Sequence, residues 1–558
     1  MGARPAIETW SSRISHGRRR ALAGEIPGAR RESLTVTLRL YNTLSRSVEE
    51  FRPVRPGKVG LYTCGPTVYD RVHIGNLRTF VWEDVMCRVF RALSFETTQI
   101  MNLTDIDDKT IRGAVAAGLP LREFTEKHIA TFFGDLGTLG VVPAALYPRA
   151  TDHIPEMVAL VKRLAARGHT YESDGSVWFR IASFPAYGRL SKIDLSAVKR
   201  GSRVADDEYE KEDVRDFAVW KAAKEGEPDS AAWTTELGRG RPGWHLECSA
   251  MSMKYLGETF DIHTGAVDNI FPHHENEIAQ SEGATGKTFV NFWLHAEHLL
   301  VDGEKMSKSK GNFYTLPDLL EKGFSPRAIR YLLVSVPYRM KLNFTLDGLR
   351  GATSAVERLE SLDLRLSERE RRKQKEEEKI SLNGEEGGGE GFARRVTDAR
   401  AAVFASLEDD FNTAGALGAL FSFVRATNVD LEAGHLSASD ATAARGLLRE
   451  IGGDVLGVMP GTAGVELRVP LTGMSLTAEA GRLTPVAAAA PDPSSPSKKS
   501  LFGPDDLDET WIHERIEARK QARKARDFKA ADAIRDELLG VGIVLEDTPQ
   551  GVRWKRKP

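Results

Sequence analysis

The chain has 558 residues, with 77 Lys plus Arg against 79 Asp plus Glu, and only three cysteines. At roughly 150 residues per domain, this length predicts about three or four domains. The net charge of −2 excludes a uniformly basic protein, so a nucleic-acid partner would have to bind a local basic patch. Three cysteines exclude a disulfide framework and predict a cytoplasmic location. No apolar run approaches the roughly 20 residues of a membrane helix, so we expect no membrane partner.

Residues 1–39 differ from the rest of the chain in composition. They contain eight arginines and three glutamates, with no lysine and little hydrophobic periodicity. An Arg-rich, acid-poor leader is typical of an organellar transit peptide. It is also compatible with a disordered extension or a misassigned start codon. We expect one of these two, with the transit peptide as the alternative.

Residues 40–146 have the pattern of an α/β fold. Lys58–Thr63 is predicted to be a buried strand, and a second strand is expected near Thr97–Asn102. A helix is expected between them, from Gly75 onward, because apolar side chains recur at helical spacing at Val81, Val85, Val89 and Leu93. Strand, helix and strand in this order begin a parallel sheet, in which ligands bind at the carboxyl ends of the strands.

The rest of the chain divides by composition and periodicity. Residues 40–146 and 241–324 are expected to be the two halves of one Rossmann-type domain, and the stretch between them has strand and turn signals of its own. The other predicted segments are an inserted domain at 147–240, a helical bundle at 325–460 with a charged insertion at 368–390, a flexible linker at 461–508 and a small C-terminal domain at 509–558.

Four side chains that can bind a metal lie far apart in the sequence. Cys64 follows the first predicted strand, Cys248 comes much later, and His273 and Glu277 are spaced to share one face of a helix. Two thiolates, an imidazole and a carboxylate are a sufficient tetrahedral ligand set for zinc. A buried cysteine and a helix-surface His–Glu pair are the structural alternatives, and spacing alone leaves both open. The third cysteine, Cys87, is expected in the core.

Two segments are candidates for binding a nucleotide. His73, Gly75 and Asn76 lie where a strand gives way to a helix, whose free N–H groups and partial positive charge favour phosphate. Lys305 and Lys308 belong to a run of lysines alternating with small residues and ended by glycine. Such a run suits a mobile loop that closes over a polyphosphate, and a basic surface loop is the other interpretation.

In combination, these segments resemble the class I cysteinyl-tRNA synthetases from about Leu40 to the C-terminus. His73–Asn76 and Lys305–Ser309 match the motifs His-Ile-Gly-His and Lys-Met-Ser-Lys-Ser, which indicate only a class I synthetase. The addition of Cys64, Cys248, His273 and Glu277 makes the match specific for cysteine. Further matching segments are Tyr41–Leu44, Cys64–Asp70, Asn102–Lys109, Arg149–Thr151, Asp216–Lys221, Gly243–Met251, Asp261–Gln280 and Asp409–Thr413.

The resemblance implies an α/β fold and an ATP-dependent, AMP-forming cysteine–tRNA ligase. The implied architecture is a class I Rossmann-type parallel-sheet catalytic domain with an inserted connective domain, then a helical bundle and a small C-terminal anticodon-binding domain. In the implied reaction, L-cysteine attacks the α-phosphate of ATP, and the cysteinyl group then passes to the 3′ end of tRNA(Cys). The implied cofactors are one Zn²⁺ per chain and Mg²⁺ with ATP, and the implied state is a monomer.

The resemblance also assigns roles to individual residues. It implies catalytic and ATP-binding roles for His73, Asn76, Lys305 and Lys308, with Gly75 as a further ATP-binding residue. It implies that Thr104, Trp244 and His263 line the amino-acid pocket. Cys64, Cys248, His273 and Glu277 would hold a zinc ion that accepts a substrate thiolate in preference to a serine hydroxyl.

Two departures from the family pattern bear on these roles. Asn76 replaces the second histidine of His-Ile-Gly-His, so it can donate a hydrogen bond but carries no charge. The segment His263–Asp268 contains fewer glycines than the family pattern. In the tail, seven basic residues between Arg515 and Lys529 face only two acidic ones, which suits binding to tRNA phosphates or a solvated helix. The resemblance of Ala530–Arg535 and Gly542–Asp547 to the family's anticodon-binding tail favours tRNA binding.

Two other functions are kept as alternatives. A cysteine ligase with an amino-sugar acceptor would share the catalytic half but lack an anticodon-binding tail. A catalytically inactive zinc- and RNA-binding paralogue would keep the scaffold without the chemistry. The tail argues against the first alternative, and the presence of His73, Lys305 and Lys308 argues against the second.

Overall fold

The computed structural model describes residues 38–193, 216–224, 227–307, 310–377 and 390–462, together with short segments of the tail between 515 and 556. Several predicted features lie outside the described residues. They are the leader 1–37, Lys308, the part of the charged insertion from 378 to 389, and the linker from 463 to 508.

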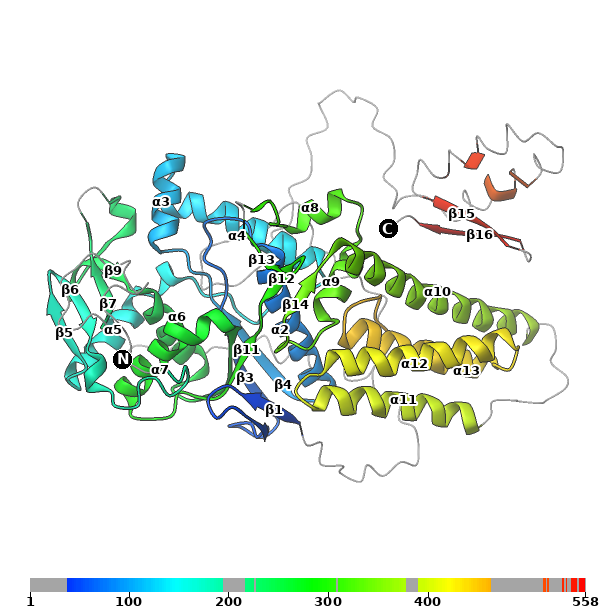
Figure 1. Cartoon of the computed structure of the whole chain (residues 1–558), viewed down its shortest axis with the longest axis horizontal. Coiled ribbons are helices and arrows are strands. Elements are labelled where there is room, and N and C mark those ends of the chain that lie inside the picture. The colour runs from blue at the N-terminus through cyan, green and yellow to red at the C-terminus, as the bar shows by residue number, and fades with distance from the viewer. Residues whose placement is uncertain are drawn as a thin grey trace, which may run out of the picture.

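A four-stranded parallel sheet forms the centre of the molecule (Figure 1). Its order is β11-β10-β3-β4, and every neighbouring pair is parallel. The expected strands appear as β3 (Lys58–Thr63) and β4 (Glu96–Met101), and the expected helix between them is α2 (Ile74–Ala92). The other strands are β10 (Phe260–Ala266) and β11 (Val290–Ala296). The predicted α/β class with a parallel sheet is therefore confirmed.

Long insertions separate the two halves of this sheet. Between β4 and β10 lies an antiparallel sheet of five strands in the order β5-β6-β7-β9-β8, next to α5, α6 and α7 in Figure 1. The strands are β5 (Thr170–Ser173), β6 (Ser176–Phe179), β7 (Phe217–Ala222), β8 (Trp233–Thr235) and β9 (Gly238–Pro242). The helices of this half are α3 (Asp108–Ala117), α4 (Leu121–Thr138), α5 (Ile154–Ala166), α6 (Trp244–Leu256) and α7 (Glu275–Thr285).

Two smaller β structures flank the parallel sheet. An antiparallel pair, β1 (Arg39–Asn42) and β2 (Ser47–Glu50), precedes it in the chain. A three-stranded sheet of order β13-β12-β14 follows β11 and carries Lys305 at its end. Its strands are β12 (Leu299–Val301), β13 (Glu304–Lys305) and β14 (Leu342–Phe344), with α8 (Leu316–Glu321) and α9 (Pro326–Val334) between the last two.

The expected helical bundle extends to one side of the catalytic part (Figure 1). It consists of α10 (Leu346–Glu377), α11 (Glu390–Glu408), α12 (Thr413–Glu432) and α13 (Ala438–Arg449). In the tail, β15 (Ile543–Thr548) pairs antiparallel with β16 (Gly551–Arg556). No helix among the described residues is long and apolar enough to cross a membrane.

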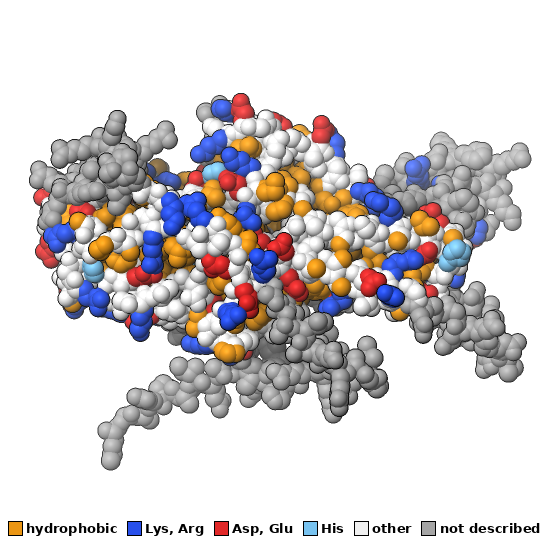
Figure 2. All heavy atoms as spheres, turned by 60° about the horizontal axis from the view of Figure 1, so that its bottom comes forward, with side chains coloured by type: hydrophobic (Ala, Val, Ile, Leu, Met, Phe, Trp, Pro, Cys, Tyr) orange, Lys and Arg blue, Asp and Glu red, His pale blue; other side chains and the backbone are white. Residues whose placement is uncertain are grey.

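The two faces of the parallel sheet are covered by different parts of the chain, as expected for a sheet buried on both sides. One apolar core joins α2 and β3 to α9 and the bundle helices. A second core joins the sheet to the inserted strands and to α5, α6 and α7. Figure 2 shows positive and negative side chains interspersed over the visible face, in keeping with the net charge of −2.

Candidate active site and metal centre

The site lies at the carboxyl ends of the neighbouring strands β3 and β10. The chain continues from β3 to β4 at one edge of the sheet and from β10 to β11 at the other edge. Such a switch point is where open α/β sheets bind ligands. Cys64 directly follows β3, and its N–H donates to the Thr264 carbonyl of β10 at 3.2 Å. The chain can turn here because the next residue is Gly65, where a Cβ would lie only 1.7 Å from the carbonyl oxygen of Asn102.

Helices α6 and α7 bring the other predicted metal donors to Cys64. Cys248 lies on α6, and its thiol is close enough to Cys64 and His273 to shift the pKa of both side chains. His273 lies in the turn η6 (Ile270–His274), and Glu277 follows in the first turn of α7. Their Nε2 and Oε1 atoms are 3.0 Å apart. Three of the four side chains predicted to bind zinc, Cys64, His273 and Glu277, therefore place their ligand atoms within 4.8 Å of one another, and Cys248 lies beside them outside this set.

A fifth donor, His274, was not predicted from the sequence. Its Nε2 lies 3.2 Å from the Cys64 sulfur, and its Nδ1 lies 2.8 Å from His295. The ligand atoms of Cys64, His273, His274 and Glu277 lie within 4.8 Å of one another. The only signal in the sequence is that His274 directly follows His273.

One buried oxygen indicates that this cluster is built for a cation. Oε2 of Glu277 lies 2.9 Å from Nε2 of His263, but Oε1 has no hydrogen-bond partner although the side chain is fully buried. Its contact with His273 is close but lacks hydrogen-bond geometry. An unsatisfied buried carboxylate oxygen is costly, and a metal bound between Glu277, His273 and the thiols removes that cost. The residues therefore fit a zinc ion.

Burial opposes the charged form of every group in the cluster, and the charges of the neighbouring groups decide whether the net pKa rises or falls. Burial raises the pKa of Glu277, but His263 and His273 outweigh it and hold this pKa at about 2. Burial lowers the pKa of His273, but Glu277 and Cys248 outweigh it and raise this pKa to about 10. Burial also raises the pKa of the Cys64 and Cys248 thiols. A metal bound here would have to displace these protons, so its affinity would fall as the pH falls.

The three residues expected to line the amino-acid pocket occupy different positions. Trp244 is 40% exposed and stacks on His273 with ring centroids 4.2 Å apart. Thr104 is buried after β4, and its hydroxyl donates to Glu247 at 2.9 Å. His263 is fully buried beside Glu277. His263 is therefore buried against the Glu277 carboxylate, whereas Trp244 is partly exposed.

The predicted nucleotide motif forms the amino end of α2. His73 is the N-cap, and its Nδ1 accepts hydrogen bonds from the N–H groups of Gly75 at 3.1 Å and Asn76 at 3.2 Å. The Asn76 side chain accepts from the N–H of His73 at 3.2 Å and completes a capping box. The expectation of free N–H groups for phosphate is therefore wrong at these two positions. Because Nδ1 accepts, the ring carries its proton on Nε2.

The Lys305 hairpin lies against this helix end. Lys305 ends β13 and is exposed, and Asn312 ties the loop by accepting from the Ser307 N–H at 2.8 Å. A Cβ at Gly75 would lie 3.2 Å from the Met306 methyl group and 2.9 Å from the His73 ring. The two predicted nucleotide motifs are therefore in contact, and Gly75 is what lets them approach. Lys308 lies outside the described residues.

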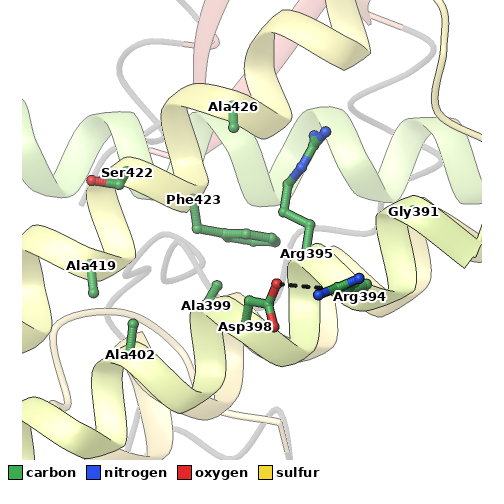
Figure 3. A pocket seen from close by; sticks show the side chains of 10 residues that line it. All are labelled: Gly391, Arg394, Arg395, Asp398, Ala399, Ala402, Ala419, Ser422, Phe423 and Ala426. Carbon is green, nitrogen blue, oxygen red and sulfur yellow. Dashed lines mark ion pairs between the residues drawn. The ribbon is translucent and has the colours of Figure 1, made fainter.

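A separate groove of about 650 Å³ lies between α11 and α12 of the bundle (Figure 3). Small side chains such as Ala402 and Ala419 form its floor, next to Phe423. Arg394 and Asp398 pair at its rim with 3.8 Å between Nε and Oδ2. None of the predicted catalytic or metal-binding residues lines this groove.

The parallel sheet, its inserted domain and the bundle have the fold of class I aminoacyl-tRNA synthetases. A methionyl-tRNA synthetase of Mycobacterium tuberculosis in complex with methionyl-adenylate is similar to this chain, with a TM-score of 0.53. The similarity covers 74% of this chain and 93% of that chain at 17% sequence identity, so it shows the fold alone.

Sequence comparison identifies the family. Residues 50–354 match the class I (C) tRNA synthetase catalytic domain, 402–459 the DALR domain and 506–554 the cysteinyl-tRNA ligase anticodon-binding domain. A cysteine–tRNA ligase of Solibacter usitatus is 48% identical over 94% of this chain and 100% of its own length. One of Brachyspira hyodysenteriae is 43% identical over 93% and 99%. The chain belongs to the cysteine–tRNA ligase family, which confirms the predicted family and enzyme class.

Proposed function

We propose that the chain activates L-cysteine with Mg-ATP and transfers it to the 3′ end of tRNA(Cys), with zinc selecting the substrate thiolate. The observation that carries this proposal is the meeting of two thiols, an imidazole and an unsatisfied carboxylate oxygen at the switch point of the sheet. This donor set suits a soft ligand, and the nucleotide motifs lie at the same edge of the sheet.

Cys64, Cys248, His273 and Glu277 are the proposed zinc ligands. A zinc ion held there supplies a soft Lewis acid that a substrate thiolate can join and a serine hydroxyl cannot join comparably. His274 is a different kind of neighbour, because its two ring nitrogens already contact Cys64 and His295. We assign it the role of orienting Cys64, in the way that outer-shell partners orient metal ligands.

In the proposed amino-acid pocket, Trp244 and Thr104 contact the substrate, and His263 holds the Glu277 carboxylate. Trp244 offers an exposed aromatic face directly above His273. Thr104 is held by Glu247 and by the Asn102 side-chain amide, which donates to its hydroxyl at 3.1 Å. These bonds fix the direction of the threonine, so it can serve as a rigid wall. His263 keeps Glu277 in place through their 2.9 Å contact.

The proposed nucleotide site uses His73, Gly75, Asn76, Lys305 and Lys308. A carboxylate oxygen of cysteine attacks the α-phosphorus of ATP, and pyrophosphate leaves with its magnesium. The 2′-hydroxyl of the terminal adenosine then attacks the carbonyl carbon of the adenylate, and AMP leaves. His73 is suited to donate from Nε2 to a phosphate oxygen, because its Nδ1 is held by the helix end. The two lysines supply positive charge where phosphate charge develops.

One assay separates this function from its alternatives. We expect cysteine-dependent exchange of pyrophosphate into ATP, followed by charging of tRNA(Cys). Exchange without charging would favour an amino-sugar acceptor, against which the match of residues 506–554 to an anticodon-binding domain already argues. A protein without exchange activity would be a binding paralogue. Light scattering on the same preparation tests the proposed monomer.

The domain boundaries and the role of the tail are part of the proposal. Deleting residues 509–558 removes β15 and β16 and the segment that matches the anticodon-binding model. We expect charging of tRNA(Cys) to fall at least about tenfold while pyrophosphate exchange stays within about twofold, because phosphate contacts and loop reading supply tRNA affinity. An equal loss of both activities would show that the tail is needed for the catalytic fold.

A further inference from the structure

A buried arginine joins the helix of the nucleotide motif to the strands that carry the Lys305 hairpin. Arg78 lies in the second turn of α2 and is only 2% exposed. Burial lowers its pKa to about 10, and no carboxylate among the described residues forms a salt bridge with it. Its guanidinium donates to the carbonyl oxygens of Glu297 at 2.7 Å, His298 at 2.9 Å, Pro337 at 3.3 Å and Met340 at 2.5 Å.

These four carbonyls mark the starts of two neighbouring strands. Glu297 and His298 directly precede β12, and the turn from Pro337 to Met340 directly precedes β14. The two strands are parallel and begin side by side, with Leu299 opposite Leu342. A single guanidinium therefore holds the starts of both strands, with Nη1 donating to the carbonyls before β12 and Nη2 to the carbonyls before β14. The strand β12 then turns back at Asp302 and Gly303 into β13, which ends on Lys305.

The same helix presents His73 and Asn76 at its amino end. The hairpin touches this end through Met306, which lies against Gly75. Arg78 adds a second attachment one turn further along α2, at the start of β12. Each of the two strands of the hairpin is therefore tied to α2 at the open end of the hairpin, β13 through Met306 and β12 through Arg78. Two attachments between one helix and one hairpin determine the orientation of the hairpin, whereas a single contact leaves it free to pivot.

We propose that Arg78 is a positioning residue that sets Lys305 relative to His73 by clamping the starts of β12 and β14 to α2. This inference rests on the proposed role of Lys305 in binding ATP. Arginine suits the position because its planar fork can donate to several acceptors in fixed directions. A lysine at this position has three donors on one atom and lacks the two separate nitrogens that here each bond the carbonyls before one strand.

A purely stabilising role is the competing explanation, and the molecule offers a matched control. Arg330 of α9 is 1% exposed and also bonds backbone carbonyls, those of Leu456 at 2.9 Å and Leu139 at 3.1 Å. It pairs with Asp84 and touches neither the hairpin strands nor the amino end of α2. Replacing either arginine disturbs a buried guanidinium, but only Arg78 holds the two nucleotide motifs together.

The test is a double-mutant cycle in the full-length, zinc-loaded enzyme, read by pyrophosphate exchange. The variants are Arg78→Lys, Lys305→Ala and their combination, with Arg330→Lys in the same cycle as the control. We expect Arg78→Lys to lower kcat/KM for ATP about 10- to 100-fold, the range expected for a misplaced catalytic group. KM for cysteine and the zinc content should change less than twofold. The double variant should lose no more than about threefold beyond Lys305→Ala, because a missing lysine cannot be misplaced.

The outcomes separate the possible failures. For the control, Arg330→Lys, the losses in kcat/KM for ATP should multiply with those of Lys305→Ala. If the losses of Arg78→Lys and Lys305→Ala also multiply, the inference is overturned and the proposed function stays intact. Full activity of Lys305→Ala would overturn the proposed role of Lys305 and the inference with it. Arg78→Gln is the second variant if Arg78→Lys does not fold, because it keeps one donor group without a buried charge. The combination of Arg78→Gln with Lys305→Ala must likewise lose no more than about threefold beyond Lys305→Ala alone.

Discussion

The amino-acid half and the nucleotide half of the active site are built in opposite ways. The proposed zinc ligands Cys248, His273 and Glu277 are almost completely buried and surrounded by further histidines. In the nucleotide half, Asn76 and Lys305 are exposed, and they sit on a helix end and a hairpin. A buried cluster is held by its many neighbours, whereas an exposed hairpin depends on a few attachments. Substitutions should therefore act on metal content in one half and on ATP kinetics in the other.

The largest effect is expected from the removal of one proposed ligand thiol. Cys248→Ser should lose zinc and lower kcat/KM for cysteine in pyrophosphate exchange by more than about 100-fold, since even outer-shell changes cost 10- to 100-fold. Metal analysis and exchange kinetics check this. The matched control is Cys87→Ser, whose buried thiol contacts Gln99 in the core away from the cluster. Retained zinc and normal cysteine kinetics in Cys248→Ser would remove this residue from the ligand set.

A second substitution distinguishes a ligand from an orienting neighbour within the buried half. His274→Gln keeps a donor near Cys64 but loses the imidazole that bridges Cys64 and His295. We expect zinc affinity to fall about 10- to 100-fold, as for an outer-shell partner, with zinc still bound at saturating concentration. A chelator competition titration measures this. Zinc loss as complete as in Cys248→Ser would instead make His274 a ligand.

In the nucleotide half, Gly75→Ala should damage activity without damaging stability. The new methyl group would lie 2.9 Å from the His73 ring and 3.2 Å from the Met306 methyl group, so the His73 ring must shift and the Met306 side chain must give way. Alanine is also a better helix former than glycine by up to about 1 kcal/mol, so the melting temperature should not fall. We expect kcat/KM for ATP to fall about tenfold with unchanged zinc content. A wild-type ATP profile would show that the contact between the two motifs is dispensable.

The sequence predicted the residues of the site but not all of the contacts between them. Motif order and periodicity predicted β3, α2 and β4 to within one or two residues, because these elements are encoded locally. Residue chemistry suggested the set of Cys64, Cys248, His273 and Glu277, but spacing left other interpretations open and only the resemblance favoured zinc. The role of His73 Nδ1 in capping its own helix depends on a rotamer that no sequence pattern reports. Likewise, nothing in the sequence shows that Arg78 binds four carbonyls rather than a carboxylate.

Two adjacent carboxyl groups of α2 lie beneath the site and should respond to pH in opposite ways. Glu83 is fully buried, and burial raises its pKa to about 8 even though the Thr264 hydroxyl donates to it at 2.6 Å. Burial also raises the pKa of Asp84, but Arg330 and Arg88 outweigh it and the net pKa is lowered. Thus Glu83 is a neutral acid over much of the physiological range, and Asp84 is an ion.

The remaining expected effect is on stability and not on activity: it is a change in the pH dependence of the free energy of unfolding. Glu83 favours the folded state below its unfolded pKa of 4.5, and this contribution is lost as the pH rises towards the folded value of about 8. The folded protein binds more protons in this window, so its stability should decline by up to about 4 kcal/mol across it. Glu83→Gln cannot ionise and should abolish this part of the decline. Melting temperatures of both proteins at pH 5 and pH 8 measure the difference.

Asp84 provides the control for the direction in which stability changes with pH. Because the folded pKa of Asp84 is lowered, its contribution is present above its unfolded pKa and disappears only in acid, as the pH falls through the folded value. Asp84→Asn should therefore be destabilised throughout the range from pH 5 to pH 8, with no change in slope. If Glu83→Gln followed the wild-type slope instead, the carboxyl of Glu83 would have to be ionised in the fold. The unpartnered Oε2 of Glu83 would then require a cation or a donor beside it.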